Sequence, residues 1–174
     1  MNVFLLLGSN MGNREAMLRE ACALLAAQAG TVTGQSGYYE SEPWGFEAAT
    51  WFVNQAVQVE TALGPAQLLH AIQRIERQLG RVRPTSPGAY ASRPIDIDIL
   101  FYGHDVIHTQ ELVVPHPLLP RRRFALLPLC ELAPGFVHPL LRATVASLLL
   151  RCNDRGAVRP FGERETENSV LRTV

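Results

Sequence analysis

The segment RPIDIDILF, residues 93–101, contains the pair of residues whose type and spacing most clearly indicate chemistry. Its alternation is typical of a β-strand, in which the isoleucines share one face and Asp96 and Asp98 share the other. Two carboxylates on such neighbouring positions lie roughly 7 Å apart and repel each other, and aspartate is disfavoured in strands. Magnesium suits this pair, because the ion is held by one or two carboxylates together with substrate phosphates. The alternative is an amphipathic edge strand whose polar face is solvated.

Arginine accounts for all 16 basic residues, and the chain contains no lysine. A GC-rich genome explains this bias as readily as function does. In either case, a cation that holds phosphate here must be Arg, which binds oxyanions with two hydrogen bonds, and a P-loop lysine is excluded. The formal net charge of zero gives no bulk attraction to nucleic acid or to an acidic membrane, so we expect neither as a partner.

The length of 174 residues suits one domain, and 47% hydrophobic with 18% charged residues is typical of a soluble globular protein. Cys22, Cys130 and Cys152 are odd in number and widely spaced, so neither a zinc site nor a disulfide framework is indicated. The apolar run 3–7 is too short for a signal peptide or a membrane span. A reducing, cytoplasmic location is therefore the default expectation.

Hydrophobic periodicity and turn residues predict an alternation of strands and helices along most of the chain. The expected elements are a strand over 2–8, a helix between Asn13 and Gly30, strands over 31–41 and 52–61, a helix from Gly64 to Gly80, the aspartate strand with a hairpin partner over 106–114, an apolar helix-like segment up to Leu132, and a helix over 144–151. Residues 155–174 are polar and charged, and we expect a flexible tail there. Removal of residues 156–174 should leave catalysis nearly unchanged.

A long loop, residues 82–94, directly precedes the aspartate strand. It carries Arg83, Tyr90 and Arg93, groups suited to phosphate or to a flat ring. Loops of this length in a compact domain are either functional lids or disordered connections.

Several other residues allow both a functional and a plain structural interpretation. Trp44 lies in a proline-glycine loop, where it folds onto the core or covers a ligand. Glu76 lies on the polar side of its helix, where pairing with a neighbouring arginine on a solvated face is the simpler interpretation. His116 stands between two prolines, which suits a positioned ligand contact or a structural cap. The run 121–123 of three arginines is either solvated or turned in part towards a shared site.

The combination of paired aspartates, nearby arginines, aromatic rings and one restrained histidine indicates transfer of a phosphate-containing group from a nucleotide. Such reactions depend on in-line positioning and on neutralisation of developing charge rather than on a covalent nucleophile.

In this order, several short motifs between about Val3 and Cys152 resemble the 6-hydroxymethyl-7,8-dihydropterin pyrophosphokinase family of the folate pathway. The matching segments are Gly8-Ser9-Asn10, YESEPWG (39–45), FVN (52–54), Glu76 with GRVR (80–83), RPIDID (93–98) and VPHP (114–117). The last two are highly specific in combination, whereas Gly-Ser-Asn alone is weak. The resemblance implies an α+β fold, a single-domain α-β-α sandwich over residues 1–154 with a mostly antiparallel sheet of ferredoxin-like connectivity and helices on both faces.

The resemblance also implies the reaction, which is transfer of pyrophosphate from ATP to the pterin hydroxymethyl group with release of AMP. Two magnesium ions are implied, held by Asp96 and Asp98, at about the separation known for two-metal sites. The implied catalytic residues are Arg81, Arg93, Asp96, Asp98 and Arg122. The implied ATP contacts are Glu76, Arg81, Arg83, Arg93, Ile99, His116 and Arg122. The implied pterin contacts are Ser41, Pro43, Trp44, Gly45, Phe52, Asn54 and Phe124.

Three departures from the family pattern stand out. Tyr90-Ala91-Ser92 replaces a common Trp-Gly-Pro, Phe52 occupies a position where Tyr is common, and the tail beyond Arg155 has no counterpart. None removes a metal ligand or a phosphate-binding arginine. We expect a monomer that acts on small molecules. An RNA-binding module fits poorly with zero net charge and two exposed aspartates, and a non-catalytic metabolite sensor has no need of a carboxylate pair.

Overall fold

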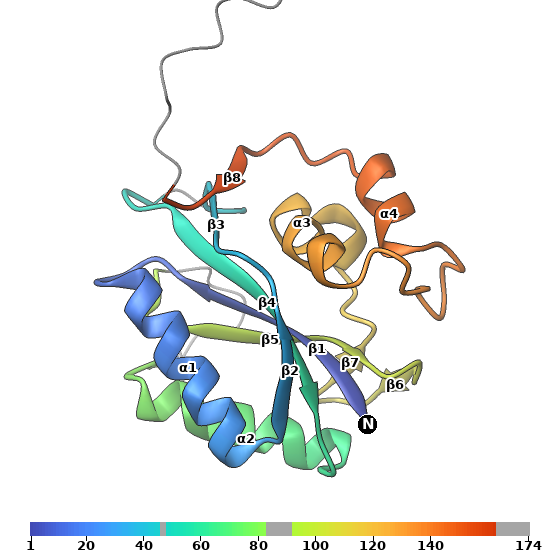
Figure 1. Ribbon diagram of the computed structural model, residues 1–174, viewed down its shortest axis with the longest axis horizontal. Coiled ribbons are helices and arrows are strands. Elements are labelled where there is room, and N and C mark those ends of the chain that lie inside the picture. The colour runs from blue at the N-terminus through green and yellow to red at the C-terminus, as the bar shows by residue number, and fades with distance from the viewer. Residues whose placement is uncertain (46–47, 83–91, 163–174) are drawn as a thin grey trace, which may run out of the picture.

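A six-stranded antiparallel sheet organises the computed structural model, which describes residues 1–45, 48–82 and 92–162 (Figure 1). Its strands are β1 (Asn2–Ser9), β2 (Thr31–Gln35), β3 (Tyr39–Ser41), β4 (Phe52–Glu60), β5 (Asp96–Tyr102) and β8 (Val158–Pro160). They lie in the order β5-β1-β4-β3-β8, and β2 also pairs with β4. Because β1 lies between β4 and β5 and is antiparallel to both, the connectivity is ferredoxin-like, as expected.

Helices cover both faces of this sheet (Figure 1). The elements α1 (Arg14–Gln28) and α2 (Pro65–Gln78) cover one face, and α3 (Arg123–Leu132) and α4 (Val145–Arg151) cover the other. Strand β1 serves both cores, since Leu5 and Leu7 pack towards α1 and α2 while Phe4 and Leu6 pack towards α3 and α4. A strand buried on both faces has no polar side to alternate with, which explains the uninterrupted apolar run. The expected α-β-α sandwich is confirmed.

The predicted helix boundaries follow from local chemistry. Asn13 caps α1 by accepting a hydrogen bond from the Ala16 N–H at 3.0 Å. After α1, Gly30 adopts a φ of 150°, and a Cβ there would lie 2.2 Å from the Glu60 carbonyl oxygen, so only glycine fits. Pro65 occupies the first turn of α2, where its missing N–H has no cost.

The strand predicted over residues 31–41 is instead divided into β2 and β3. Ser36 lies at the division, and its Oγ, in place of a backbone oxygen, accepts a hydrogen bond from the Ala56 N–H at 3.0 Å. The register against β4 also shifts between Val32 and Gly34. A side-chain acceptor inserted into the ladder ends regular pairing, a feature that propensity does not reveal.

The predicted hairpin between the aspartate strand and residues 106–114 is wrong. Within the described residues, β5 pairs only with β1, and this segment forms its own small ladder of β6 (Ile107–His108) and β7 (Val113–Val114). A turn held by a hydrogen bond from the Thr109 N–H to the Leu112 carbonyl at 2.9 Å folds the segment back on itself. The backbone N–H of His116 contacts β5 instead, donating to the Leu100 carbonyl at 3.0 Å.

The flexible tail predicted from residue 155 is also corrected in part. Strand β8 forms the end of the sheet beside β3, with Glu40 opposite Arg159 and Ser41 opposite Val158. Residues 163–174 lie outside the described residues, so the expectation for them stays a prediction.

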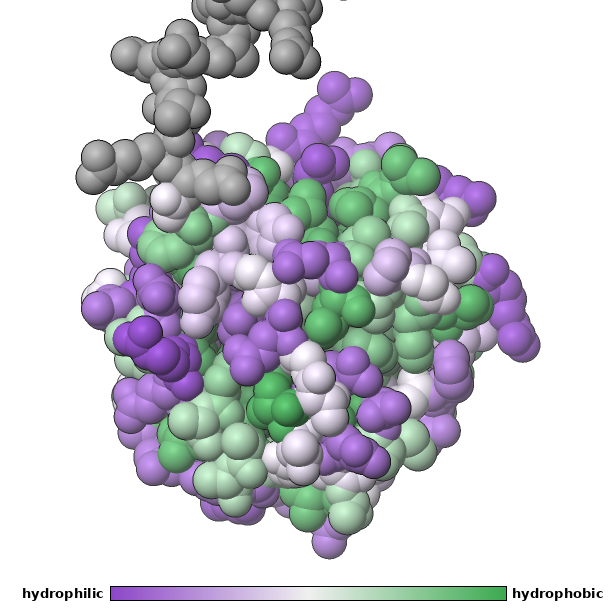
Figure 2. Space-filling view, viewed as in Figure 1, coloured by the Kyte–Doolittle hydropathy of each residue, from purple (hydrophilic) through white to green (hydrophobic). Residues whose placement is uncertain are grey.

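Apolar and charged side chains interleave over the face seen in Figure 2, with the more apolar surface around α3 and α4. Exposed large hydrophobic residues of this C-terminal part are Leu140, Leu141 and Leu150. In the described parts of the chain, no helix has the length and apolar character needed to cross a membrane.

Candidate active site

A cavity of about 450 Å³ opens where β1, β4 and β5 meet the end of α2 and the start of α3. It brings together most of the residues predicted from the sequence. Those lining it are Ser41, Trp44, Phe52, Asn54, Glu76, Arg81, Arg93, Asp96, Asp98, Ile99, His116, Arg122 and Phe124. Pro43 and Gly45 belong to the same loop as Trp44 but are not among the lining residues. Arg83 and Tyr90 lie outside the described residues.

The two aspartates share one face of β5, and that face points into the cavity. Strand β5 is an end strand of the sheet, as the alternative interpretation supposed. The aspartate side chains are nevertheless only 23% and 30% exposed, and both are paired with cationic side chains. The solvated-edge interpretation therefore fails for this face of the strand.

Each aspartate is approached by two basic groups. Asp96 forms ion pairs with Arg81 and with Arg93, whose NH1 lies 3.1 Å from Asp96 Oδ2. Asp98 Oδ2 lies 3.5 Å from NH1 of Arg122 and 3.8 Å from Nε2 of His116. The cavity thus contains an acidic centre surrounded by positive charge.

Glu76 is buried at the end of α2, which excludes the solvated-face interpretation. Its Oε1 accepts a hydrogen bond from the Ile97 N–H at 2.9 Å and also pairs with Arg81. Arg81 therefore bridges Glu76 and Asp96, and these contacts join α2 to the aspartate strand. Helical periodicity alone could not identify this role, because Glu76 is buried against a strand end rather than against the main apolar stripe of the helix.

The pKa values reflect this crowding of charge. Burial, followed by repulsion from Asp96, raises the pKa of Asp98 to about 7. Burial, with a further effect of Arg122, lowers the pKa of His116 to about 4, so the imidazole is neutral near pH 7. Burial alone would lower the pKa of Arg81, but the carboxylates of Asp96 and Glu76 outweigh it and raise that pKa.

The neutral imidazole has a defined orientation. Nδ1 of His116 accepts a hydrogen bond from the Leu118 N–H at 3.2 Å. The ring proton is therefore assigned to Nε2, the atom that faces Asp98 across the cavity. This nitrogen is positioned to donate a hydrogen bond to an anionic ligand.

Aromatic rings line the other half of the cavity. The guanidinium of Arg122 lies 4.9 Å from the ring centroid of Trp44 and 5.7 Å from that of Phe124. Arg93 lies 5.8 Å from the ring centroid of Phe52. These distances are within the range of cation–π attraction, so the arginines connect the aromatic half to the acidic half.

Asn54 is a buried amide between these rings. Its Nδ2 donates a hydrogen bond to Ser41 Oγ at 2.8 Å, which fixes the side chain with Oδ1 towards Gly8. A Cβ at Gly8 would lie 3.0 Å from that oxygen and 3.6 Å from Phe52. Glycine at this position therefore leaves space over the Asn54 amide, where the sheet forms the floor of the cavity.

Asn10 holds the start of the aspartate segment in place. Its Oδ1 accepts a hydrogen bond from the Arg93 N–H at 2.8 Å, while Nδ2 donates to Ser92 Oγ at 3.0 Å. Among the residues that the structure describes, the buried Nε of Arg93 has no hydrogen-bond partner. A buried charged donor without a partner is costly, and an anionic ligand would satisfy it.

Some lining residues were not predicted from the sequence. Leu69 and Gln73 share a face of α2 with Glu76, and their spacing of four and then three residues was a signal that could have found them. The segment 111–113 also lines the cavity. The erroneous hairpin prediction had placed that segment along β5, so its position at the cavity could not be anticipated.

The donor set suits a hard cation only in the presence of further oxygen ligands. No cluster of three or more His, Cys, Asp or Glu side chains suited to a metal occurs in residues 1–45, 48–82 and 92–162. Asp96 and Asp98 supply carboxylate oxygens on one face, and phosphate oxygens of a ligand would complete the coordination that magnesium prefers.

Known proteins resemble this chain in sequence. The family model described as 7,8-dihydro-6-hydroxymethylpterin-pyrophosphokinase (HPPK) matches residues 4–134. A 2-amino-4-hydroxy-6-hydroxymethyldihydropteridine pyrophosphokinase of Porphyromonas gingivalis is 42% identical over 138 residues, which are 79% of this chain and 93% of that protein. One of the same name from Bacillus subtilis is 45% identical over 130 residues, 74% of this chain and 76% of that protein.

A solved structure has the same fold. The Plasmodium falciparum HPPK-DHPS triple mutant S436F/A437G/A613S superimposes with a TM-score of 0.70 at 19% identity. The match covers 86% of this chain but 44% of the Plasmodium chain, so this chain spans less than half of that protein. The family match over most of the chain, together with these relatives, establishes that the chain belongs to the 7,8-dihydro-6-hydroxymethylpterin-pyrophosphokinase family.

Proposed function

We propose that the cavity is the site at which this chain transfers the pyrophosphoryl group of ATP to the hydroxymethyl group of 6-hydroxymethyl-7,8-dihydropterin. The products are AMP and the pterin diphosphate, and the reaction belongs to folate biosynthesis. The observation that carries the proposal is the junction of two halves in one cavity: the aspartate pair with its arginines, and the aromatic half around Asn54.

The arginines and His116 bind the phosphate chain of ATP. Arg81, Arg93 and Arg122 carry positive charge at the acidic centre, and Nε2–H of neutral His116 donates to a phosphate oxygen. The remaining proposed ATP contacts are Glu76, Arg83 and Ile99. Once bound to the phosphates, these groups neutralise the negative charge that develops during transfer, which is how most phosphoryl-transfer sites act.

Asp96 and Asp98 hold two magnesium ions in this proposal. When bound, the ions polarise the phosphates and neutralise their charge. Burial is the main cause of the raised pKa of Asp98 and repulsion from Asp96 is the second, and a bound cation would favour the charged form of both carboxylates. Because Arg81 and Arg93 pair with Asp96, these pairs open as the arginines move to the phosphates.

The aromatic half binds the pterin. Phe52 and Phe124 stack on the two faces of the ring, and Asn54 with backbone groups of residues 41–45 reads its polar edge. The orientation of the amide supports this role, because Ser41 occupies the Nδ2 group and leaves Oδ1 for a ring N–H. A site built for such hydrogen bonds rejects analogues that lack them, because its polar groups would stay unpaired.

Reaction follows from positioning, without a covalent intermediate. Stacking brings the hydroxymethyl oxygen towards the phosphates, while Arg93 spans both halves through Phe52 and Asp96. We also propose that the chain works as a monomer in the cytoplasm on small molecules alone, which fits its zero net charge and its unpaired cysteines.

The direct test is AMP formation from ATP, magnesium and the reduced pterin, measured with and without each component. We expect AMP only with all three, and Asp98→Ala to abolish turnover while Asp105→Ala, on a turn away from the cavity, retains it. No AMP with the complete mixture would overturn the proposal. Residual activity of Asp98→Ala above about 10% would refute the metal assignment, since loss of a metal ligand removes several kcal/mol of transition-state stabilisation.

A further inference from the structure

A C-terminal strap, defined here as residues 154–161, runs beside β3 at the edge of the sheet (Figure 1). It lies beyond the residues 4–134 that match the family model. We propose that this strap is a positioning element that holds both walls of the pterin site, so that it sets the affinity for the pterin rather than for ATP. The proposal rests on the proposed location of the pterin site.

The first wall is the chain that leaves β3. Beyond the β3–β8 pairing, the Glu42 N–H donates to the Ala157 carbonyl at 3.2 Å, and the Ala157 N–H donates to Glu42 Oε2 at 3.1 Å. Ser41 and Glu42 both line the cavity and lead directly to Trp44. The strap therefore fixes the course of the backbone where the pterin loop begins.

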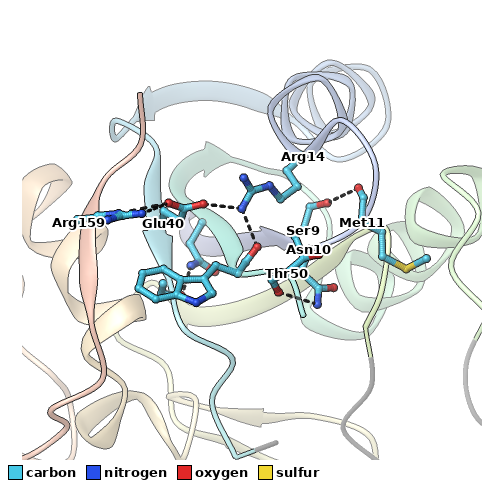
Figure 3. Close-up of polar contacts among 10 residues, drawn as sticks. Ser9, Asn10, Met11, Arg14, Glu40, Thr50 and Arg159 are labelled. Atoms are coloured by element: carbon cyan, nitrogen blue, oxygen red, sulfur yellow. Dashed lines mark hydrogen bonds and ion pairs between the residues drawn. The ribbon is translucent and has the colours of Figure 1, made fainter. Parts of the chain in front are cut away.

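Glu40 connects the strap to the base of this loop (Figure 3). Its Oε2 accepts a hydrogen bond from Arg159 NH2 at 3.0 Å, and its Oε1 accepts one from Arg14 NH1 at 2.7 Å. Figure 3 shows the two arginines approaching the carboxylate from opposite sides. The side chains of Arg14 and Glu40 are only 19% and 16% exposed, so their attraction is less screened than that of a surface pair.

The far end of the same loop is held through the same arginines. NH1 of Arg14 also donates to the Trp51 carbonyl at 2.7 Å, directly before Phe52. The guanidinium of Arg159 lies 5.0 Å from the ring centroid of Trp51. Both ends of the connection between β3 and β4 are thus tied to one charged cluster that includes the strap.

The second wall is the start of α3. The N-cap residue Arg122 provides no side-chain cap for this helix. Instead, Asp154 Oδ2 accepts a hydrogen bond from the Arg123 N–H at 3.0 Å, and its Oδ1 accepts one from the Gly156 N–H at 3.0 Å. A carboxylate at a helix N-terminus satisfies a free donor and interacts favourably with the helix dipole. Asp154 thereby fixes the turn from which Phe124 reaches the cavity.

The ATP half depends on other elements. Arg81 follows α2, Arg93 precedes β5, and His116 follows β7, whereas the strap's contacts given above reach β3 and the start of α3. Arg122, the N-cap of α3, is the one proposed phosphate contact next to a strap contact, and its side chain is also paired with Asp98 of β5. Loss of the strap's contacts should therefore loosen the pterin walls and leave the phosphate contacts of Arg81, Arg93 and His116 in place. This conclusion replaces the expectation that residues 156–161 are dispensable.

The test is the double variant Asp154→Ala/Arg159→Ala in the full-length chain, assayed for AMP formation with each substrate varied in turn. We expect KM for the pterin to rise about tenfold, the scale of one lost helix cap and one partly exposed ion pair. KM for ATP and kcat should change much less than KM for the pterin, about two- to threefold, because Arg122 is the one phosphate contact beside the strap. The conservative variant Asp154→Asn/Arg159→Lys keeps an acceptor and a cation and should retain most of the wild-type affinity. Arg155→Ala removes an exposed arginine of the same segment and is the matched control.

Two outcomes of the double variant would overturn the proposal. An unchanged KM for the pterin would refute it directly. A parallel rise of both KM values with a lowered Tm would show that the strap only supports the fold. Phe124→Ala separates this failure from failure of the pterin site itself: if Phe124→Ala also leaves KM for the pterin unchanged, the site is misplaced, and if it raises that KM, only the role of the strap is wrong.

Discussion

Removal of the Glu76 carboxylate should destabilise the protein by an amount that depends on whether a hydrogen-bond acceptor remains. The side chain of Glu76 is 2% exposed, and its Oε1 serves both the Ile97 N–H and Arg81. In Glu76→Ala the Ile97 N–H loses its acceptor, which costs about 1–3 kcal/mol. Removal of one partner of a buried ion pair costs about 3–5 kcal/mol. Because Arg81 remains paired with Asp96, we expect less than half of this cost in Glu76→Ala. The expected total is about 2–5 kcal/mol.

Glu76→Gln separates the two contributions. Its amide oxygen still accepts from the Ile97 N–H, so the main change is the replacement of a charged acceptor for Arg81 by a neutral one. Hydrogen bonds to charged groups contribute about 1 kcal/mol more than neutral ones, so a loss of about 1–2 kcal/mol is expected. Arg74→Ala, an exposed change on the same helix, should stay within about 0.5 kcal/mol of wild type.

Urea unfolding at equilibrium measures these differences, provided that the m-value is the same in all variants. KM for ATP should rise in both Glu76 variants, because Arg81 is no longer held between α2 and β5. An equal loss of stability in Glu76→Gln and Glu76→Ala would refute the reasoning, since the retained acceptor would then have no value. A loss in Glu76→Ala as small as that of Arg74→Ala would show that the bridge to Ile97 and Arg81 does not support the fold.

Three other predictions test separate parts of the molecule. Gly8→Ala places a methyl group 3.0 Å from Asn54 Oδ1. KM for the pterin should rise about tenfold, as expected from a hydrogen bond weakened by about 1.4 kcal/mol, while KM for ATP should stay unchanged. Equal effects on both KM values would contradict a local clash. Burial of Glu40 opposes ionisation, but Arg14 and Arg159 lower its pKa below the ordinary value of 4.5. The contribution of the Glu40 carboxylate to folding stability is therefore complete above pH 4.5 and is lost as the pH falls through the folded-state pKa. Glu40→Gln should therefore lower the unfolding midpoint near pH 7, and the difference in midpoint between variant and wild type should shrink in acid. A difference in midpoint that is the same at every pH would refute the role given to the Glu40 carboxylate. Chelation of divalent cations with EDTA should stop AMP formation and added magnesium should restore it, whereas turnover that persists in EDTA would exclude the proposed role of Asp96 and Asp98.

The parts of the fold that sequence predicted well depend on local interactions. The stripe of α2, the Asn13 cap of α1 and the two faces of the aspartate strand each follow from residues a few positions apart. The errors arose where distant residues decide. Ser36 enters the ladder opposite Ala56, and β8 pairs with a strand more than 100 positions earlier, so neither pairing leaves a local signal.

The residues of the site show the same distinction between local signals and long-range contacts. Residue types identified the aspartates and arginines, but their pairing could not be derived, because Arg81 meets Asp96 only through the course of the chain between α2 and β5. Asn10 and Arg93 are separated by 83 positions, and their mutual hydrogen bonds are a property of the folded sheet. The resemblance to a family supplied such positions as a set, without the physical reason for each.

The charge arrangement explains how the acidic centre of the cavity, formed by Glu76, Asp96 and Asp98, can stay folded and still receive a polyanion. Glu76, Asp96 and Asp98 are matched by Arg81, Arg93 and Arg122, so this centre is close to neutral and each of its three carboxylates has a partner. ATP alone would add uncompensated negative charge beside the aspartates. If the aspartates accept magnesium while the arginines turn to the phosphates, both sets of charges exchange partners and neither is left buried alone. Binding of nucleotide without the metal should therefore be weak, because the arginines could reach the phosphates only by leaving Asp96 and Asp98 unpaired.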